Sequence, residues 1–274
     1  MQDTITTLYC VCADLLRALE ITDDPQMRLS QAEVMLTPLV GALYFGGKIE
    51  RAHQFLFEHG YCKARLSKSR LNRRLHRLPL EVWTTLFDLL GQVFKDHNTS
   101  QNYTVDSMPF PVCDNIRIKR CRLLQGEEHR GYCASKRRYY FGLKVHLLIT
   151  GQGHPVEILL TPASVADVAA LKGLPLDLPP GAKIHGDRAY TDYKEEDLLL
   201  DCGQIVLQSQ RKKNSKRQLL PWLEALGRPI RQRVETTFSQ VESLLPKHIH
   251  AVTARCLVLK VLCFFLATAF LAFL

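Results

Sequence analysis

The apolar positions follow two different periods along the chain, and the change falls near residue 100. Residues 1–59 carry apolar side chains three or four positions apart, as in Leu8, Val11, Leu15 and Leu19. Side chains at this spacing share one face of a helix. Beyond residue 102 the spacing drops to two, most strictly at Phe141, Leu143, Val145, Leu147 and Ile149. This alternation predicts half-buried strands, so we place a domain boundary in the polar linker 95–101.

The elements expected after the linker have a recognisable order. We predict strands at 103–106, 141–149 and 156–160, a helix at 164–171, a strand at 182–186, a helix at 192–202, a strand at 205–207 and a long helix at 230–245. Gly151 and Gly153 indicate a hairpin turn between the second and third strands. Antiparallel strands followed by alternating helices and strands form a mixed sheet covered by helices. We therefore predict an α/β, RNase H-like catalytic domain over 99–274, preceded by a helical domain over 1–98.

Basic residues are concentrated in one segment of the helical domain. The net charge of +9 favours a polyanionic partner, and residues 62–78 hold seven Lys or Arg and no acid. Leu71, Leu75 and Leu78 would share one helix face, which leaves the other faces to the cations. The segment is either a solvated basic helix or part of a helix-turn-helix-like domain. We predict the second, with DNA contacts from Lys68, Arg70, Arg73, Arg74 and Arg77.

Two further basic runs lie in the strand-rich half. Residues 117–138 carry eight Lys or Arg against two acids, and Arg211, Lys212, Lys213, Lys216 and Arg217 follow later. Each run either holds phosphates or forms a solvated loop; we predict DNA contacts from Lys136, Arg137 and Arg138. The same region contains Cys113, Cys121, His129 and Cys133, but it lacks the close cysteine pair of structural zinc sites. Incidental thiols are the interpretation we favour.

The cysteines and the C-terminal segment bear on the location in the cell. Nine scattered cysteines and no charged-then-apolar leader favour a reducing cytosol. After Lys260 the apolar run is 14 residues long, whereas a membrane span needs about 20. We therefore expect a buried terminal helix, no membrane partner, and a cytosolic protein.

Three acids fall on elements that can bring them together. Asp106 belongs to the first strand, Asp187 follows the fourth strand, and Glu235 lies on the last long helix. Taken singly, they also fit a turn residue, a salt-bridged strand end and a solvated helix acid. Three converging carboxylates suit Mg²⁺ or Mn²⁺, and two such ions stabilise both oxygens of a phosphoryl displacement. His146 and His185 lie near these acids in the sequence, and we expect structural roles for both.

Four blocks of sequence resemble one known family. They are 106–113 (DSMPFPVC), 142–146 (GLKVH), 186–190 (GDRAY) and 231–239 (RQRVETTFS), and the basic block 66–74 (LSKSRLNRR) adds to them. In this order they resemble the insertion-sequence 982 family of bacterial DDE transposases. The resemblance implies an RNase H-like core, Mg²⁺ bound by Asp106, Asp187 and Glu235, and cutting and joining at the ends of a mobile element.

The signature around the last acid departs from related families. Those families place Tyr, Arg, Glu and Lys at fixed spacings on this helix. Arg231 stands four residues before Glu235, as the pattern requires, but Arg228 and Glu242 occupy the Tyr and Lys positions. Glu242 therefore competes with Glu235, and Asp114 similarly competes with Asp106.

The function predicted from these features is DNA transposition. We expect metal-dependent phosphodiester hydrolysis and strand transfer, with Arg231 among the DNA contacts, two bound ions, and the protein as a homo-oligomer, a dimer, on DNA. Its DNA partners would be the terminal repeats of the element and the target. The alternatives are an RNase H-like nuclease without strand transfer and a non-catalytic DNA-binding regulator.

Overall fold

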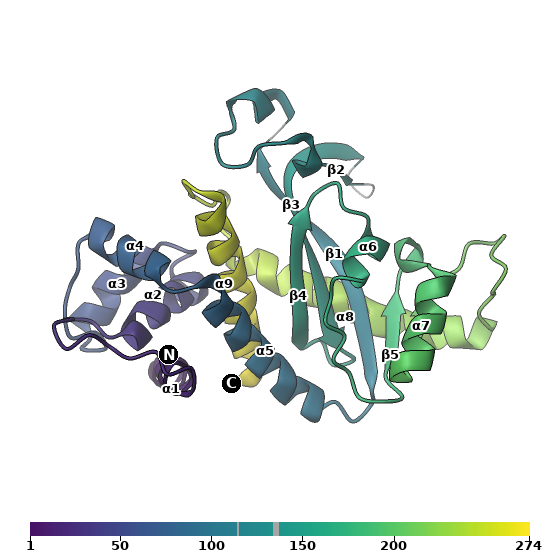
Figure 1. Ribbon diagram of the computed structural model, residues 1–274, viewed down its shortest axis with the longest axis horizontal. Helices are drawn as coiled ribbons and strands as arrows, with labels where there is room; N and C mark the ends of the chain where they lie inside the picture. Colours follow the sequence, from purple (N-terminus) through teal and green to yellow (C-terminus); the bar gives the residue numbers. More distant parts are fainter. Residues whose placement is uncertain (114, 134–136) are drawn as a thin grey trace. The chain divides into compact units, whose positions relative to one another are not determined.

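The computed structural model describes residues 1–113, 115–133 and 137–274, with the backbone alone at 115 and 116. Residue contacts divide the chain into two compact units, and Figure 1 colours both along the sequence. One unit joins Met1–Leu90 to Gln240–Leu274, and the other is Gly91–Ser239.

The first unit is helical, as the spacing of apolar residues predicted. It contains α1 (Gln2–Ala18), α2 (Gln31–Tyr44), α3 (Ile49–Glu58), α4 (Lys68–Arg77), most of α5 (Leu80–Asp96), the end of α8 (Pro221–Leu244) and α9 (Ala254–Phe273). Helix α2 begins with a capping box between Ser30 and Glu33, which satisfies two backbone donors at its first turn. The helix-turn-helix character of this unit stays a prediction.

The core of the helical unit is built on α2 and α9. Helix α2 is buried from Ala32 to Ala42, and α9 packs against it. Gly47, in the left-handed region at φ +74°, lies under the ring of Phe264, where an added Cβ would be 2.8 Å away. The hydropathy pattern had led us to expect the terminal helix in the catalytic domain. By contacts it groups with the N-terminal helices, because an all-apolar helix is buried wherever an apolar face accepts it.

Helix α9 also has the length and composition of a membrane span. Among the described residues it alone meets that test, and 67% of its apolar window is buried inside the protein. A helix that is apolar on all sides is buried either in protein or in lipid, and this degree of burial matches a core helix.

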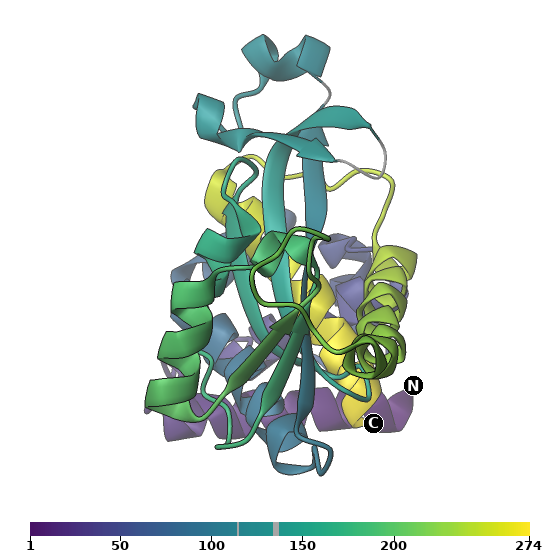
Figure 2. The same ribbon diagram turned by 90° about the vertical axis from the view of Figure 1, so that its right-hand side faces the viewer.

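The second unit contains a mixed sheet, which confirms the predicted α/β class (Figure 2). Its strands are β1 (Asn102–Cys113), β2 (Arg130–Cys133), β3 (Arg138–Thr150), β4 (Pro155–Pro162), β5 (Lys183–Gly186) and β6 (Val206–Ser209). The order is β2-β3-β1-β5-β6, and β4 also pairs with β3. Strands β1, β3 and β4 pair antiparallel, whereas β5 runs parallel to β1 and β6.

Helices lie on both faces of this sheet. Side chains of a strand alternate between faces, and Thr104 of β1 donates a hydrogen bond to the Ile230 carbonyl of α8, 3.2 Å away. On the opposite face, Lys144 of β3 donates to the Val165 carbonyl, just before the short helix α6 (Asp167–Leu171). Helix α7 (Tyr193–Gly203) connects β5 to β6.

Helices α6 and α8 begin at other residues than the sequence predicts. Helix α6 begins at Asp167, three residues late, because Ala163 and Ser164 form the turn that leaves β4. Helix α8 begins at Pro221, nine residues before the predicted start at 230, and includes Pro229. The insertion between β1 and β3 adds β2 and the short helices η1 (Asn115–Arg120) and η2 (Glu127–His129).

Candidate active site

Asp106 lies on the central strand of the sheet, half-buried and on the face that α8 covers. It shares this face with Thr104, and its carboxylate accepts a hydrogen bond from the Ser107 N–H at 2.7 Å. Burial raises the pKa of Asp106 to about 7; the charges of Asp187, Asp167 and Glu235 raise it further, while the Ser107 N–H opposes the shift. A carboxyl group in this condition gains from a nearby cation.

Asp187 is the residue directly after β5, the parallel neighbour of β1. Thr104 pairs with His185 across these strands. Asp106 and Asp187 each follow two residues later, so they lie at the same height along the two parallel strands. The Asp187 carboxylate caps η3 (Arg188–Tyr190) by accepting the Ala189 N–H at 2.8 Å. Partial burial raises its pKa and so does the charge of Asp167, while backbone N–H groups and Arg231 oppose the shift.

Glu235 and Arg231 lie one turn apart on α8. Glu235 is exposed, and its charge contributes to the raised pKa of Asp106. Arg231 is half-buried; burial lowers its pKa, and the charge of Asp187 works against this. Helix α8 comes close to β5 because Gly227 lies against His185, where an added Cβ would be 3.2 Å from Nδ1.

The two competing acids are placed differently. Glu242 belongs to the helical unit, where it is exposed. Asp114 lies outside the described residues. Within the described ranges, no three His, Cys, Asp or Glu side chains lie close enough to form a metal-binding group.

Asp167 is an acid of this region that the sequence did not reveal. It begins α6, its Oδ1 lies 3.3 Å from Lys144 Nζ and 3.6 Å from His146 Nδ1, and its charge raises the pKa of both Asp106 and Asp187. An acid in the first turn of a helix is usually explained by the helix dipole. The sequence did contain one sign of an acid at this place: Lys144 and His146 lie on the same face of a strand that is otherwise apolar.

Two buried aromatic side chains complete the surroundings of the acids. His146 is fully buried and bonds Thr161 Oγ1 through Nε2 at 3.0 Å. Tyr190 is buried against Gly186, where an added Cβ would be 3.1 Å from its own. Burial raises the pKa of the Tyr190 hydroxyl, and Asp167, Asp106 and Asp187 raise it further. His185 is also buried and bonds Asn102 Oδ1 at 3.0 Å.

The arginines of α4 divide into two groups. Lys68, Arg70, Arg73 and Arg77 are exposed. The guanidinium of Arg74 instead donates to the Leu29 carbonyl and to Gln31 Oε1. Arg74 thus holds the chain before α2 in place, a role beside the phosphate contact predicted from the sequence.

The basic runs of the sheet unit divide in the same way. Lys136 lies outside the described residues, and Arg137 and Arg138 are exposed where β3 begins. In the later run, Arg211 forms two hydrogen bonds to Glu196, at 2.6 and 2.8 Å. Arg217 forms two to Asp197 at 2.7 and 2.8 Å, and both guanidiniums lie over the ring of Tyr193. The lysines of this run, Lys212, Lys213 and Lys216, are exposed.

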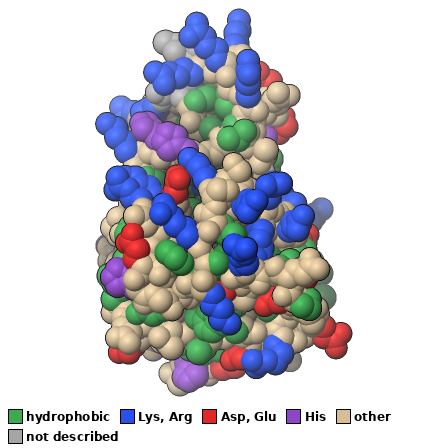
Figure 3. All heavy atoms as spheres, turned by 90° about the vertical axis from the view of Figure 1, so that its left-hand side faces the viewer, with side chains coloured by type: hydrophobic (Ala, Val, Ile, Leu, Met, Phe, Trp, Pro, Cys, Tyr) green, Lys and Arg blue, Asp and Glu red, His purple; other side chains and the backbone are tan. Residues whose placement is uncertain are grey.

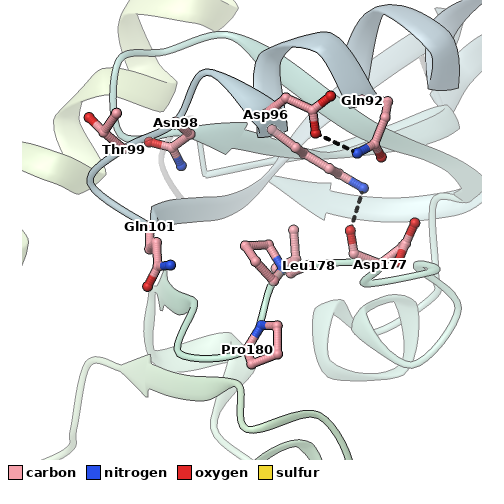
Figure 4. A pocket seen from close by; sticks show the side chains of 10 residues that line it. Gln92, Asp96, Asn98, Thr99, Gln101, Asp177, Leu178 and Pro180 are labelled. Carbon is pink, nitrogen blue, oxygen red and sulfur yellow. Dashed lines mark hydrogen bonds between the residues drawn. The ribbon is translucent and has the colours of Figure 1, made fainter.

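A groove of about 570 Å³ lies at the other end of β1 (Figure 4). Gln92, Asn98 and Gln101 line it with Asp177 and Pro180. Lys95, which also lines it, donates to the Asp177 carbonyl at 2.8 Å and forms a buried ion pair with Glu157 at 2.7 Å. None of the three predicted carboxylates lines this groove.

Comparison with known proteins places the chain in a family. A family model described as the transposase DDE domain matches residues 96–250. A cryo-EM structure of the piggyBac transposase synaptic complex with hairpin DNA is similar over 97% of this chain and 71% of that chain, with 10% identity and a TM-score of 0.49; this likeness is too distant to assign a fold or a function. No curated protein matches the chain. The matched segment is more than half of the chain and includes Asp106, Asp187 and Glu235, so the chain belongs to the family of transposase DDE domains.

Proposed function

We propose that this transposase is an RNase H-like, metal-dependent polynucleotidyl transferase that cuts and joins DNA at the ends of a mobile element. The observation that carries the proposal is the position of Asp106 beside Asp187 on neighbouring parallel strands, within the segment that matches the DDE family. The blocks resembling the insertion-sequence 982 family support the same assignment.

The acids fit a hard divalent cation by their chemistry. Carboxylate oxygens are the donors that Mg²⁺ and Mn²⁺ prefer. The raised pKa of Asp106, about 7, marks a place where negative charge is poorly compensated by the chain itself. We propose Asp106 and Asp187 as two ligands and Glu235 as the third, because its charge also acts on Asp106. Two cations held there would stabilise the charge on the attacking and leaving oxygens of the phosphate.

The proposed reaction is a pair of displacements at phosphorus. In the first, the oxygen of a water molecule bonds to the scissile phosphorus while the bond to the 3′ oxygen breaks, which leaves a 3′-hydroxyl and a 5′-phosphate. In the second, that 3′-hydroxyl attacks a phosphodiester of the target, and the target's own 3′ oxygen leaves. Arg231, beside Asp187, is placed to orient the phosphate, because guanidinium groups match phosphate oxygens.

The DNA itself would be held by cations away from the acids. Lys68, Arg70, Arg73 and Arg77 of α4 are exposed and supply phosphate contacts, which are the main source of affinity in such complexes. We propose the terminal repeats and the target DNA as partners, a dimer as the working form on DNA, and the cytosol and nucleoid as the location.

The test is cleavage and joining of labelled end DNA in Mg²⁺. Asp106→Asn, Asp187→Asn and Glu235→Gln should each lower the rate on the order of a thousandfold, since removing a ligand raises the barrier by about 4 kcal/mol. DNA binding without metal should remain, because these side chains act mainly in the transition state. Glu242→Gln is the matched control and should cut normally.

Four outcomes would contradict the proposal in different ways. Normal cutting by all three variants would exclude this site from the chemistry. If Glu242→Gln lost cutting while Glu235→Gln remained active, Glu242 would be the third metal ligand in place of Glu235. Cut ends without joined products would indicate a nuclease that does not transfer strands. DNA binding without any cutting would indicate a non-catalytic regulator.

A further inference from the structure

Two exposed tyrosines lie side by side on β2 and the first residues of β3. Tyr132 of β2 pairs directly with Tyr139 of β3. Their rings are 4.9 Å apart between centroids and tilted by 54°. The residues are 53% and 57% exposed, respectively. Tyrosine rings in solvent offer an apolar face beside a polar hydroxyl, which suits them to binding another molecule.

The opposite face of this hairpin explains why the pair faces solvent. Gly131 and Tyr140, which alternate with the exposed pair, are buried. A Cβ on Gly131 would lie 2.8 Å from Ala163 Cβ and from the Tyr140 ring, so this side of the hairpin packs closely on the turn after β4. The Ser164 N–H also donates to the Glu128 carbonyl at 2.9 Å. The hairpin is thus anchored by one face and presents Tyr132 and Tyr139 on the other.

The surroundings of the tyrosine pair are basic. Arg130 stands two residues before Tyr132 on the same face, in an exposed ion pair with Glu127 at 3.2 Å. The insertion adds the exposed cations Arg117, Lys119, Arg120, Arg122 and Arg137. At the top of Figure 3, where the insertion lies, Lys and Arg side chains project into solvent. This charge is complementary to a polyanion.

We propose that Tyr132 and Tyr139 form a stacking platform for unpaired bases of DNA, with the nearby cations holding the backbone. The proposal rests on the proposed function and specifies the form of its substrate. Base faces are hidden inside a duplex, whereas aromatic side chains among cations bind the exposed faces of single strands with little sequence preference. The platform therefore selects melted or single-stranded DNA over intact duplex.

The register of the sheet gives the distance of this platform from the candidate active site. Asp106 pairs with Leu147 of β3, and Tyr139 lies eight residues from Leu147 along the same strand. At about 3.3 Å per residue this is about 26 Å, the length of about eight stacked nucleotides. A DNA strand running straight along β3 from the proposed cut would reach the platform after about eight nucleotides.

The experiment measures binding by the full-length protein in EDTA, so that no cutting occurs. The probes are a mixed-sequence 16-nucleotide single strand and the duplex of the same sequence, with 2-aminopurine reporting stacking. The variants are Tyr132→Ala with Tyr139→Ala, and Tyr132→Phe with Tyr139→Phe. The alanine variant should lose about tenfold or more in affinity for the single strand and less than twofold for the duplex. The phenylalanine variant should bind as the parent does, because its rings still stack.

Each contrary result has its own meaning. Equal losses on the two probes, or no loss on either, would overturn the stacking platform. A change in sedimentation of the alanine variant without a change in DNA binding would make the pair a contact between copies, which also overturns it. Cleavage is not measured, so binding that depends on the rings supports the platform even if the proposed chemistry fails. Retained thermal unfolding of both variants checks that the hairpin still folds.

Discussion

The buried imidazole of His146 should make the stability of the protein fall in mild acid. Its side chain is fully buried, Nε2 bonds Thr161 Oγ1, and Nδ1 has no hydrogen-bond partner among the described residues. Burial lowers the pKa of His146 to about 4; Lys144 lowers it too, while the charge of Asp167 works the other way. A buried neutral histidine of this kind must take up a proton when the chain unfolds.

The size and sign of the effect follow from the two pKa values. An unfolded histidine titrates near pH 6.5, and His146 in the folded protein titrates near 4. Its contribution to stability is fully present above pH 6.5 and is lost as the pH falls towards 4. At about 1.4 kcal/mol per pH unit, the loss is about 2 kcal/mol by pH 5 and about 3 kcal/mol in total.

The assay is urea-induced unfolding at pH 7 and pH 5, followed by far-ultraviolet circular dichroism. His146→Gln keeps a polar partner for Thr161 and stays neutral, so it should lose about 2 kcal/mol less than the parent between the two pH values. Titrating groups that do not contact His146 are common to both proteins and cancel in this comparison. His248→Gln, at an exposed position, is the control and should follow the parent. Equal losses in His146→Gln and the parent would refute the reasoning.

Three further predictions concern the helical unit. Replacing Arg70, Arg73 and Arg77 by Gln should weaken duplex binding. The slope of log affinity against log salt concentration should fall by about 0.9 for each phosphate that the protein no longer neutralises. An unchanged slope in a fluorescence-anisotropy salt titration would place the DNA elsewhere. Arg74→Gln should instead lower the melting temperature and spare the salt slope, because its guanidinium bonds the chain itself, and a reduced slope would contradict that. Helix α9 should not hold the protein in membranes after carbonate washing, since most of it is buried in the protein; retention in the membrane pellet would contradict the core assignment.

Local patterns in the sequence determined the secondary structure and the positions of Asp106 and Asp187 along their strands. Strict alternation over 141–149 predicted β3, which extends over Arg138–Thr150, because a side chain's face depends only on its position along the strand. Asp187 directly follows the short strand predicted at 182–186, and an acid there must lie at the strand's end. Together with the DDE family match, these local features sufficed to propose Asp106 and Asp187.

Tertiary structure alone decided the features that depend on distant residues. Arg74 looks like its neighbours on α4, yet its guanidinium bonds Leu29 and Gln31, which are more than 40 residues away. Asp167 reads as an ordinary helix-starting acid until Lys144 and His146 of β3 are placed beside it. Tyr132 and Tyr139 alternate with their neighbours as core residues would. They are exposed because the opposite face of the hairpin, at Gly131, packs on Ala163. A periodic pattern in the sequence shows which residues share one face of a helix or strand. The segment that covers this face is determined by contacts between residues far apart in the chain. Such contacts produce no periodic pattern, so the sequence alone does not reveal them.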